Sequence, residues 1–382
     1  MTALTSLNAS SGNPALRLAQ IARARTAVIR EEAGVQGLRL AGSVRIEPWI
    51  TQSWQRCLAR GQSPQQPVLF EAISAQAMRR HAEQNRQLRE AAHGVIDTMQ
   101  HTLARTGYFA LLTNATGTVI DMGGPIDMQD RRASCIARLG VDLSEASVGT
   151  TAIGAALAEL KPVWLHRGEH FFTDTTVYSC AGAPIFGSDG ACVGMLDLTG
   201  IEAPERRELQ HLVAQAATQI ENRLAQALPH LFSLQLYWPG LAAPQDAGWL
   251  GLDTDGRICA ANRTGRTMLG LPTQGVPTAL PHFDEVFATA HGHVFDAARR
   301  GAPVELPLWS GLTMMARVLR SDHDFANDTA GSTAPLKALT TDFIRKAVSN
   351  ARGNVSIAAQ TLGISRATVY RKLTSSKSHK KQ

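Results

Sequence analysis

The spacing of apolar residues changes repeatedly along the chain, and each period predicts a different kind of element. In the first third, apolar positions recur at helical spacing, which predicts helices over residues 15–32, 47–60 and 70–106. The last of these has a charged middle and apolar ends, so we expect one long helix that projects from or borders a domain. Two interpretations of this helix stay open, a partner helix in a dimer and an exposed connector.

The middle of the chain alternates between strand and helix patterns. Two β-rich runs around Asn-Ala-Thr-Gly predict a hairpin over residues 108–121. Residues 150–160 predict a capped helix, residues 162–166 a strand, and SCAGAPIF and ACVGMLDLTG two strands around a Gly-Ser-Asp-Gly turn. An amphipathic helix over residues 202–228 follows. This order predicts an α+β domain, an antiparallel sheet with flanking helices.

A second, smaller unit is predicted over residues 229–320. GWLGLDTDGRICAANRTGRTMLGL indicates a strand, a tight Asp-Thr-Asp-Gly turn, a strand and a helix that opens near Asn262. LPLWSGLTMMARVL indicates a further pair of strands. Residues 321–335 are polar and rich in small residues, which is typical of a linker, and residues 1–14 have a composition typical of disorder.

The segment over residues 340–373 carries the pattern of three short amphipathic helices. Gly353 ends the first helix and Asn354 can cap the second; Gly363 lies just past the second, and Ser365 can cap the third. Two helices joined by a short turn that contains Gly form a helix-turn-helix, whose second helix enters the major groove of DNA. The alternative is a solvated helical hairpin.

The charge distribution favours a DNA-binding helix-turn-helix over a solvated hairpin. The chain has a formal net charge of +6, whereas residues 336–382 hold ten Lys or Arg against one Asp, so the rest of the chain is close to neutral. A basic C-terminal segment on an otherwise nearly neutral chain is typical of a segment that binds a polyanion such as DNA. The five cysteines form no CxxC pair, and no apolar run approaches the roughly 18 residues of a membrane span. We therefore expect a cytoplasmic protein.

The string GNVSIAAQTLGISRATVYRKL resembles the Fis-type helix-turn-helix that ends many bacterial transcription regulators. In that family the DNA contacts come from the start and the exposed face of the last helix. Carried over by position, the resemblance implies DNA contacts for Ser365, Arg366, Thr368, Arg371 and Lys372. Arg366 at the helix N-terminus can reach a guanine edge or a phosphate, whereas Arg371 and Lys372 are better placed for phosphates.

GTTAIGAALAELKPVWLHRGEHFF and SCAGAPIFGSDGACVGMLDLTG are similar to the GAF sensor domain of the acetoin-catabolism-type activators, and SWQRCLARG matches their N-terminal signature. The resemblance implies a small-molecule sensor flanked by helices that transmit its state. The candidate ligand-binding residues are His166, His170, Phe171, Tyr178 and Cys180. Trp49 and Trp54 are alternatively ligand-stacking residues or packing residues.

The cluster His166, His170 and Cys180 also permits a second interpretation. Two histidines four residues apart with a cysteine ten further on suggest mixed nitrogen and sulfur ligation of a metal, although no fourth ligand is evident. The simpler interpretation is a set of polar residues near a pocket. No nucleophile motif such as GxSxG occurs, so we expect no catalytic residue, no metal and no cofactor.

Residues 229–320 resemble a reduced PAS-type module, which could bind a ligand, mediate dimerisation or space the sensor from the DNA reader. In the resembled activators an AAA+ ATPase lies between sensor and helix-turn-helix, but here the fifteen residues 321–335 intervene. The chain also contains no Gly-Lys pair and hence no GxxxxGK[ST] phosphate-binding loop. The dependence on sigma-54 polymerase that is typical of these activators is therefore an open question.

The predicted domains, in chain order, are a disordered N-terminus (1–14), a helical region (15–106), a GAF-like sensor with its C-terminal signalling helix (107–228), a PAS-like module (229–320), a linker (321–335) and the helix-turn-helix with its basic tail (336–382). We predict a homodimeric regulator without ATPase activity that binds operator DNA and a small effector, with RNA polymerase as a further partner. Two alternatives remain: an ATPase-less chain that heterodimerises with and modulates a full-length sigma-54 activator, and an enzyme that uses the His166, His170 and Cys180 cluster.

Overall fold

The computed structural model describes residues 14–30, 46–240, 247–273 and 279–321. The described residues contain two antiparallel five-stranded sheets with helices, which confirms the predicted α+β class. The predicted helix-turn-helix and basic tail lie outside the described residues, as do residues 1–13 of the predicted disordered N-terminus and all but the first residue of the linker. None of the described helices is both long enough and apolar enough to span a bilayer.

The first sheet has the strand order β2-β1-β5-β4-β3 and corresponds to the predicted GAF-like domain. Its strands are β1 (Tyr108–Asn114), β2 (Val119–Gly123), β3 (Val163–His166), β4 (Tyr178–Phe186) and β5 (Cys192–Ile201). Every residue of β1, β3 and β4 is buried, because helices and connecting segments cover both faces of the sheet. This explains the nearly continuous apolar runs that the sequence shows here.

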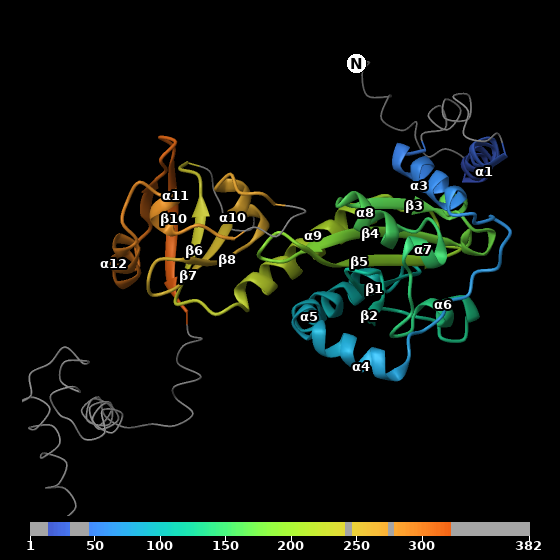
Figure 1. Ribbon diagram of the computed structural model, residues 1–382, viewed down its shortest axis with the longest axis horizontal. Helices are drawn as coiled ribbons and strands as arrows, with labels where there is room; N and C mark the ends of the chain where they lie inside the picture. The colour runs from blue at the N-terminus through green and yellow to red at the C-terminus, as the bar shows by residue number, and fades with distance from the viewer. Residues whose placement is uncertain (1–13, 31–45, 241–246, 274–278, 322–382) are drawn as a thin grey trace, which may run out of the picture. The chain divides into compact units, whose positions relative to one another are not determined.

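The two faces carry different helices (Figure 1). On one face lie α3 (Pro48–Ala59) and α8 (Ala152–Glu159), which share a core with alternate residues of β1 such as Leu111. On the other face lie α5 (Arg86–Leu103) and α9 (Glu208–Gln226), which share a second core with Leu112.

The remaining elements of this part of the chain are short, apart from the first helix. They are α1 (Pro14–Arg30), α4 (Ala75–Gln84), α6 (Arg131–Ile136), α7 (Glu145–Val148) and the 3-10 helices η1 (Arg167–Glu169) and η2 (Thr173–Thr175).

The predicted single helix over residues 70–106 is wrong in detail. Residues 70–73 are extended and lie beside the segment around Val141, to which Ala72 pairs in an isolated bridge. The helical part is broken at Asn85, whose φ of −105° and ψ of 15° separate α4 from α5. The apolar side of α5 packs on the sheet within its own chain. This surface therefore needs no dimer partner to cover it.

The second sheet has the order β8-β7-β6-β10-β9 and belongs to the predicted smaller module. Its elements are β6 (Phe232–Tyr237), β7 (Gly248–Leu252), β8 (Ile258–Ala261), α10 (Arg263–Met268), α11 (Phe283–Val286), α12 (Gly292–Arg300), β9 (Val304–Pro307) and β10 (Thr313–Arg320). Asn262 caps α10, as predicted, by accepting a hydrogen bond from the Gly265 amide at 2.7 Å. The sequence prediction missed β6, the central strand, which alternates buried and half-buried residues.

Candidate functional site

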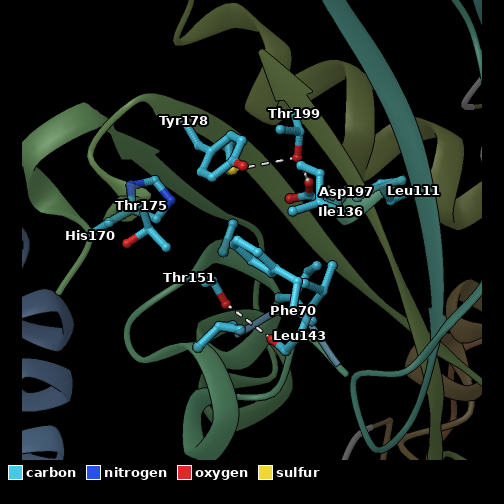
Figure 2. Close-up of a pocket in the computed structure, with 14 residues that line it drawn as sticks. Phe70, Leu111, Ile136, Leu143, Thr151, His170, Thr175, Tyr178, Asp197 and Thr199 are labelled. Atoms are coloured by element: carbon cyan, nitrogen blue, oxygen red, sulfur yellow. Dashed lines mark hydrogen bonds between the residues drawn. The ribbon is translucent and has the colours of Figure 1, made fainter. Parts of the chain in front are cut away.

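A cavity of about 30 Å³ lies between the first sheet and the helices of its α8 face (Figure 2). Its floor comes from β1, β4 and β5, and its roof from α8 and the preceding segment. Most of the lining is apolar and includes Phe70, Leu111, Ile136, Leu143 and Ile153. One water needs about 10–15 Å³ by this measure, so the cavity as it stands has room for only a few heavy atoms.

Local sequence explains how the roof comes so close to the sheet. The Thr151 side chain caps α8 by accepting a hydrogen bond from the Gly154 amide at 3.1 Å. Gly182 of β4 faces this helix, and a Cβ atom there would lie 3.0 Å from the Ala152 carbonyl oxygen. Glycine at this position therefore permits α8 to pack directly on β4, which sets the depth of the cavity.

A polar group is built into this apolar wall by three neighbouring strand residues. Asp197 and Thr199 are two residues apart on β5 and so share a face, and Cys180 of β4 is directly paired with Thr199. Thr199 Oγ1 donates a hydrogen bond to Asp197 Oδ2, and Cys180 Sγ lies 3.5 Å from Thr199 Oγ1 (Figure 2). Asp197 Oδ1 is buried and has no hydrogen-bond partner among the described residues.

Burial controls the protonation of this group. It raises the pKa of Asp197 to about 7, although the hydrogen bond from Thr199 acts in the opposite direction. It also raises the pKa of the Cys180 thiol well above its ordinary value. Near neutral pH the Asp197 carboxyl is therefore present both in its protonated form, which can donate a hydrogen bond, and in its ionised form, which can only accept one. Cys180 is an unreactive thiol.

His170 supplies a second polar atom to the same cavity. Its Nδ1 atom lies 2.9 Å from the Arg167 carbonyl oxygen, which can only accept, so Nδ1 carries the proton. Burial lowers the pKa of His170 to about 4, so the ring is neutral and Nε2 is an acceptor. Nε2 is buried and has no hydrogen-bond partner among the described residues. A ligand hydroxyl could satisfy it.

The five predicted ligand-binding residues separate into two groups. His170, Tyr178 and Cys180 line the cavity, with the Tyr178 hydroxyl donating to the Arg132 carbonyl oxygen at 3.0 Å. His166 and Phe171 are buried but are not among the lining residues.

His166 and Phe171 instead take part in the packing of this region against η1 and α1. His166 Nδ1 is 2.9 Å from Ser179 Oγ, and its backbone amide donates to Glu169 Oε2 at 2.6 Å. The Phe171 carbonyl accepts a hydrogen bond from Arg25 of α1.

Sequence reasoning missed Asp197, Thr199 and Phe70. A signal for the first two was present, because GMLDLTG places an acid and a threonine two residues apart in an otherwise apolar strand. No comparable signal marks Phe70, which precedes α4 by several residues and reaches the cavity only through the tertiary fold.

Trp49 and Trp54 are packing residues. Trp54 is fully buried and Trp49 nearly so, and both belong to the core under α3. Trp54 Nε1 donates a hydrogen bond to the Glu169 carbonyl oxygen at 2.9 Å. This excludes an exposed stacking surface at these two positions.

Within the part of the chain that the structure describes, one set of three potential metal-ligating side chains has its ligand atoms within 4.8 Å of one another, namely His282, Asp284 and His291. The earlier candidates His166, His170 and Cys180 are not in it. Hydrogen bonds account for the set: the His291 amide donates to Asp284 Oδ1 at 2.9 Å, and the Asp284 amide donates to His282 Nδ1 at 3.2 Å.

Two regions of the chain match known protein families. Residues 34–222 match the family described as MimR, N-terminal domain, and residues 341–374 match the family described as bacterial regulatory protein, Fis family. Residues 341–374 therefore have the sequence of a Fis-type helix-turn-helix, as the resemblance implied. The two matches confirm the resemblance to acetoin-catabolism-type activators.

The relatives include the acetoin catabolism regulatory protein of Cupriavidus necator, 28% identical over 63% of this chain and 37% of the relative. The propane 2-monooxygenase operon transcriptional activator MimR of Mycolicibacterium smegmatis is 32% identical over 36% of this chain and 24% of the relative. The chain thus spans well under half the length of these curated relatives. A solved structure of the E. coli DhaR(N)–DhaL complex is similar with a TM-score of 0.44 and 12% identity, covering 72% of this chain and 99% of that one.

Proposed function

We propose that this chain is a one-component sensor: a small, neutral, hydroxyl-bearing molecule binds in the cavity beneath the first sheet and changes the affinity of the Fis-type helix-turn-helix for operator DNA. The observation that carries the proposal is the pair of unsatisfied polar atoms, His170 Nε2 and Asp197 Oδ1, on residues that line one small apolar cavity. Buried polar atoms in folded proteins are normally hydrogen-bonded, so unpaired ones in a pocket favour a ligand role.

The chemistry of the two atoms restricts the ligand. A hydroxyl can donate to His170 Nε2, and a hydroxyl or carbonyl can pair with Asp197, which is near its midpoint of protonation at neutral pH. The apolar wall and the absence of a Lys or Arg from the lining disfavour an anion. Small alcohols, diols and hydroxyketones meet these polarity conditions.

A route from the sensor to the rest of the chain begins at α9. Glu221 of this helix accepts a hydrogen bond from the Phe186 amide of β4 at 2.9 Å, and one from Arg263 of α10 at 2.7 Å. The Arg263 guanidinium also lies over the Phe186 ring, 4.4 Å from its centroid. A ligand that displaces β4 would act on these contacts, and it can shift the chain between states only if it binds one state better.

The proposed DNA-bound form is a homodimer acting in the cytoplasm, with its two recognition helices in successive major grooves about one turn apart. RNA polymerase is proposed as a further partner. ATP hydrolysis is not part of the proposal, because the printed sequence contains no GxxxxGK[ST] motif.

The test begins with fragments of genomic DNA selected by the purified chain, whose affinities are measured over a salt series and then with a panel of small diols and hydroxyketones. We expect salt-dependent binding to a few duplexes and a change in affinity with one ligand class. A chain that is folded but binds no duplex with salt sensitivity, with or without the panel, contradicts the proposal.

A second candidate function rests on the printed sequence, which contains no GxxxxGK[ST] motif between the first sheet and the Fis-type segment. The chain could heterodimerise with a full-length activator and modulate it. Co-purification of a stable mixed dimer, together with weak DNA binding by this chain alone, would favour that function over the first.

A further inference from the structure

A second cavity, of about 140 Å³, lies among α4, the first turn of α5, β2 and the segment around Gly140. It shares no lining residue with the sensor cavity. Its walls are largely apolar and include Met78, Val119 and Leu139, and its cationic groups are Arg79 and Arg89. The volume is close to the roughly 150 Å³ cavity that accommodates benzene in another protein, so a ligand with a body of about six heavy atoms fits.

The charge of this cavity is unbalanced. No Asp or Glu is among its lining residues, and neither Arg79 nor Arg89 has an ion-pair partner within the described part of the chain. The nearest acids along the helices, Glu83 and Glu90, lie 3.8 Å and 3.4 Å from Arg86 instead. Arg89 Nε is buried and without a hydrogen-bond partner among the described residues.

Arg89 brings a buried, unpaired donor to this cavity wall; four other arginines of the described residues also have a buried nitrogen without a partner, but none of them lines this cavity. A guanidinium has five donors, and a buried donor without an acceptor loses its hydration with no compensating bond. The other polar side chains of the wall are engaged elsewhere: His81 Nδ1 is 3.0 Å from Asn114 Nδ2, and Thr118 Oγ1 is 3.3 Å from Thr116 Oγ1. Among the described residues, no side chain of the wall accepts a hydrogen bond from Arg89 Nε, so a ligand can supply the acceptor.

We propose that this cavity binds a small organic carboxylate, its apolar body against Met78, Val119 and Leu139 and its carboxylate on Arg89 with Arg79 at the rim. Arginine and carboxylate form charge-assisted and often bidentate hydrogen bonds, which matches the donor left open at Arg89. The site differs in chemistry from the sensor cavity, which has no cationic side chain in its wall. It would give the chain a second effector, of anionic class.

The test is titration calorimetry of the purified full chain at low salt with benzoate and butyrate, and with benzyl alcohol as the uncharged counterpart of benzoate. We expect benzoate to bind and benzyl alcohol to bind about tenfold more weakly or not at all. Benzoate affinity should fall with added salt, because the guanidinium–carboxylate attraction is screened. Inorganic phosphate should bind less well than benzoate, since it has no apolar body.

Four variants separate the site from the fold. Arg89→Gln should weaken benzoate at least about tenfold, while Arg89→Lys, which keeps the charge, should retain part of the affinity. Ala82→Leu should block binding by filling the cavity. Arg80→Gln is the control, because Arg80 lies on α4 next to the lining residue Arg79 but outside the wall, and it should bind as the parent does.

The proposal is overturned if benzoate fails to bind the folded parent chain, if Arg89→Gln binds it unchanged, or if benzyl alcohol or phosphate binds equally well. Retained secondary structure and melting temperature establish that each variant is folded. Because the measurement is direct binding, it stands or falls independently of whether the chain regulates transcription.

Discussion

Arg56 of α3 forms two hydrogen bonds to the Glu145 carboxylate of α7, at 2.9 Å and 2.7 Å, across 89 positions of sequence. Ser53 and Arg60 donate to the same carboxylate at 2.7 Å and 3.0 Å. All three donors lie in SWQRCLARG, the signature noted in the sequence, and Glu145 lies in the segment that precedes the cavity roof. The signature therefore anchors an N-terminal helix to the domain of the first sheet.

Arg56→Ala should lower the free energy of unfolding by about 1–2 kcal/mol, because it removes two charge-assisted bonds from a nearly buried acid. The expected loss of unfolding free energy is no larger because about a third of the Arg56 side chain is exposed and the other two donors remain. Urea unfolding measures the change. Arg60→Ala, which removes one bond from a more exposed arginine, should cost less, and an equal or larger cost would contradict this ranking.

Asp197→Asn should change how stability depends on pH. An acid whose pKa is raised from 3.8 to about 7 by burial binds its proton more tightly in the folded chain. The contribution of this proton binding to the free energy of unfolding is fully present below about pH 4 and is lost as the pH rises through 7. Asparagine cannot ionise, so the variant should gain stability relative to the parent between pH 5 and pH 8, as followed by thermal unfolding. Parallel pH profiles for the two chains would refute the raised pKa.

His170→Leu should separate ligand binding from stability. It removes a buried acceptor without a partner among the described residues, and the Arg167 carbonyl still accepts the residue 170 amide at 3.0 Å. We expect an unfolding free energy within about 1 kcal/mol of the parent, but loss of the response to the small hydroxyl-bearing effector. The control is Thr175→Val, because the Thr175 hydroxyl already donates to the Phe172 carbonyl at 3.0 Å. A normal response in His170→Leu would remove this residue from the site.

Arg263→Gln should weaken the link between effector and DNA while effector affinity stays near that of the parent. Arg263 bonds to Glu221, a carboxyl whose pKa burial raises, and not to the cavity lining. Effector binding by calorimetry and DNA affinity with and without effector give the two quantities. Arg263→Lys keeps the charge and should keep part of the coupling. Equal coupling in the parent and in Arg263→Gln would exclude this route.

Arg366→Ala should weaken operator binding by roughly 1–3 kcal/mol if Arg366 reads a base. Ser365, Thr368, Arg371 and Lys372 also remain predicted contacts, and all lie outside the described residues. Arg371→Ala should instead weaken binding to all duplexes alike and reduce the salt slope by about one, as expected for a phosphate contact. Electrophoretic shifts at several salt concentrations distinguish a base contact from a phosphate contact. An unchanged shift for Arg366→Ala would exclude Arg366 as a DNA-contacting residue.

The sequence by itself determined the two hairpins of the first sheet and the class of the Fis-type segment, whereas it missed β6 and the break at Asn85. β-rich runs and Gly-containing turns predicted the β1–β2 and β4–β5 hairpins, and family motifs predicted the Fis-type segment. Such signals are local, since a turn or a strand period depends on residues a few positions apart.

Only the tertiary structure decided which residues share the cavity. His166 and His170 are four positions apart, yet one faces Ser179 and the other lines the cavity with Asp197. The pairing of Cys180 with Thr199 and the approach of Phe70 depend on strand register and on long-range packing. Sequence spacing does not encode these relations, because a shift of one residue along a strand moves a side chain to the opposite face.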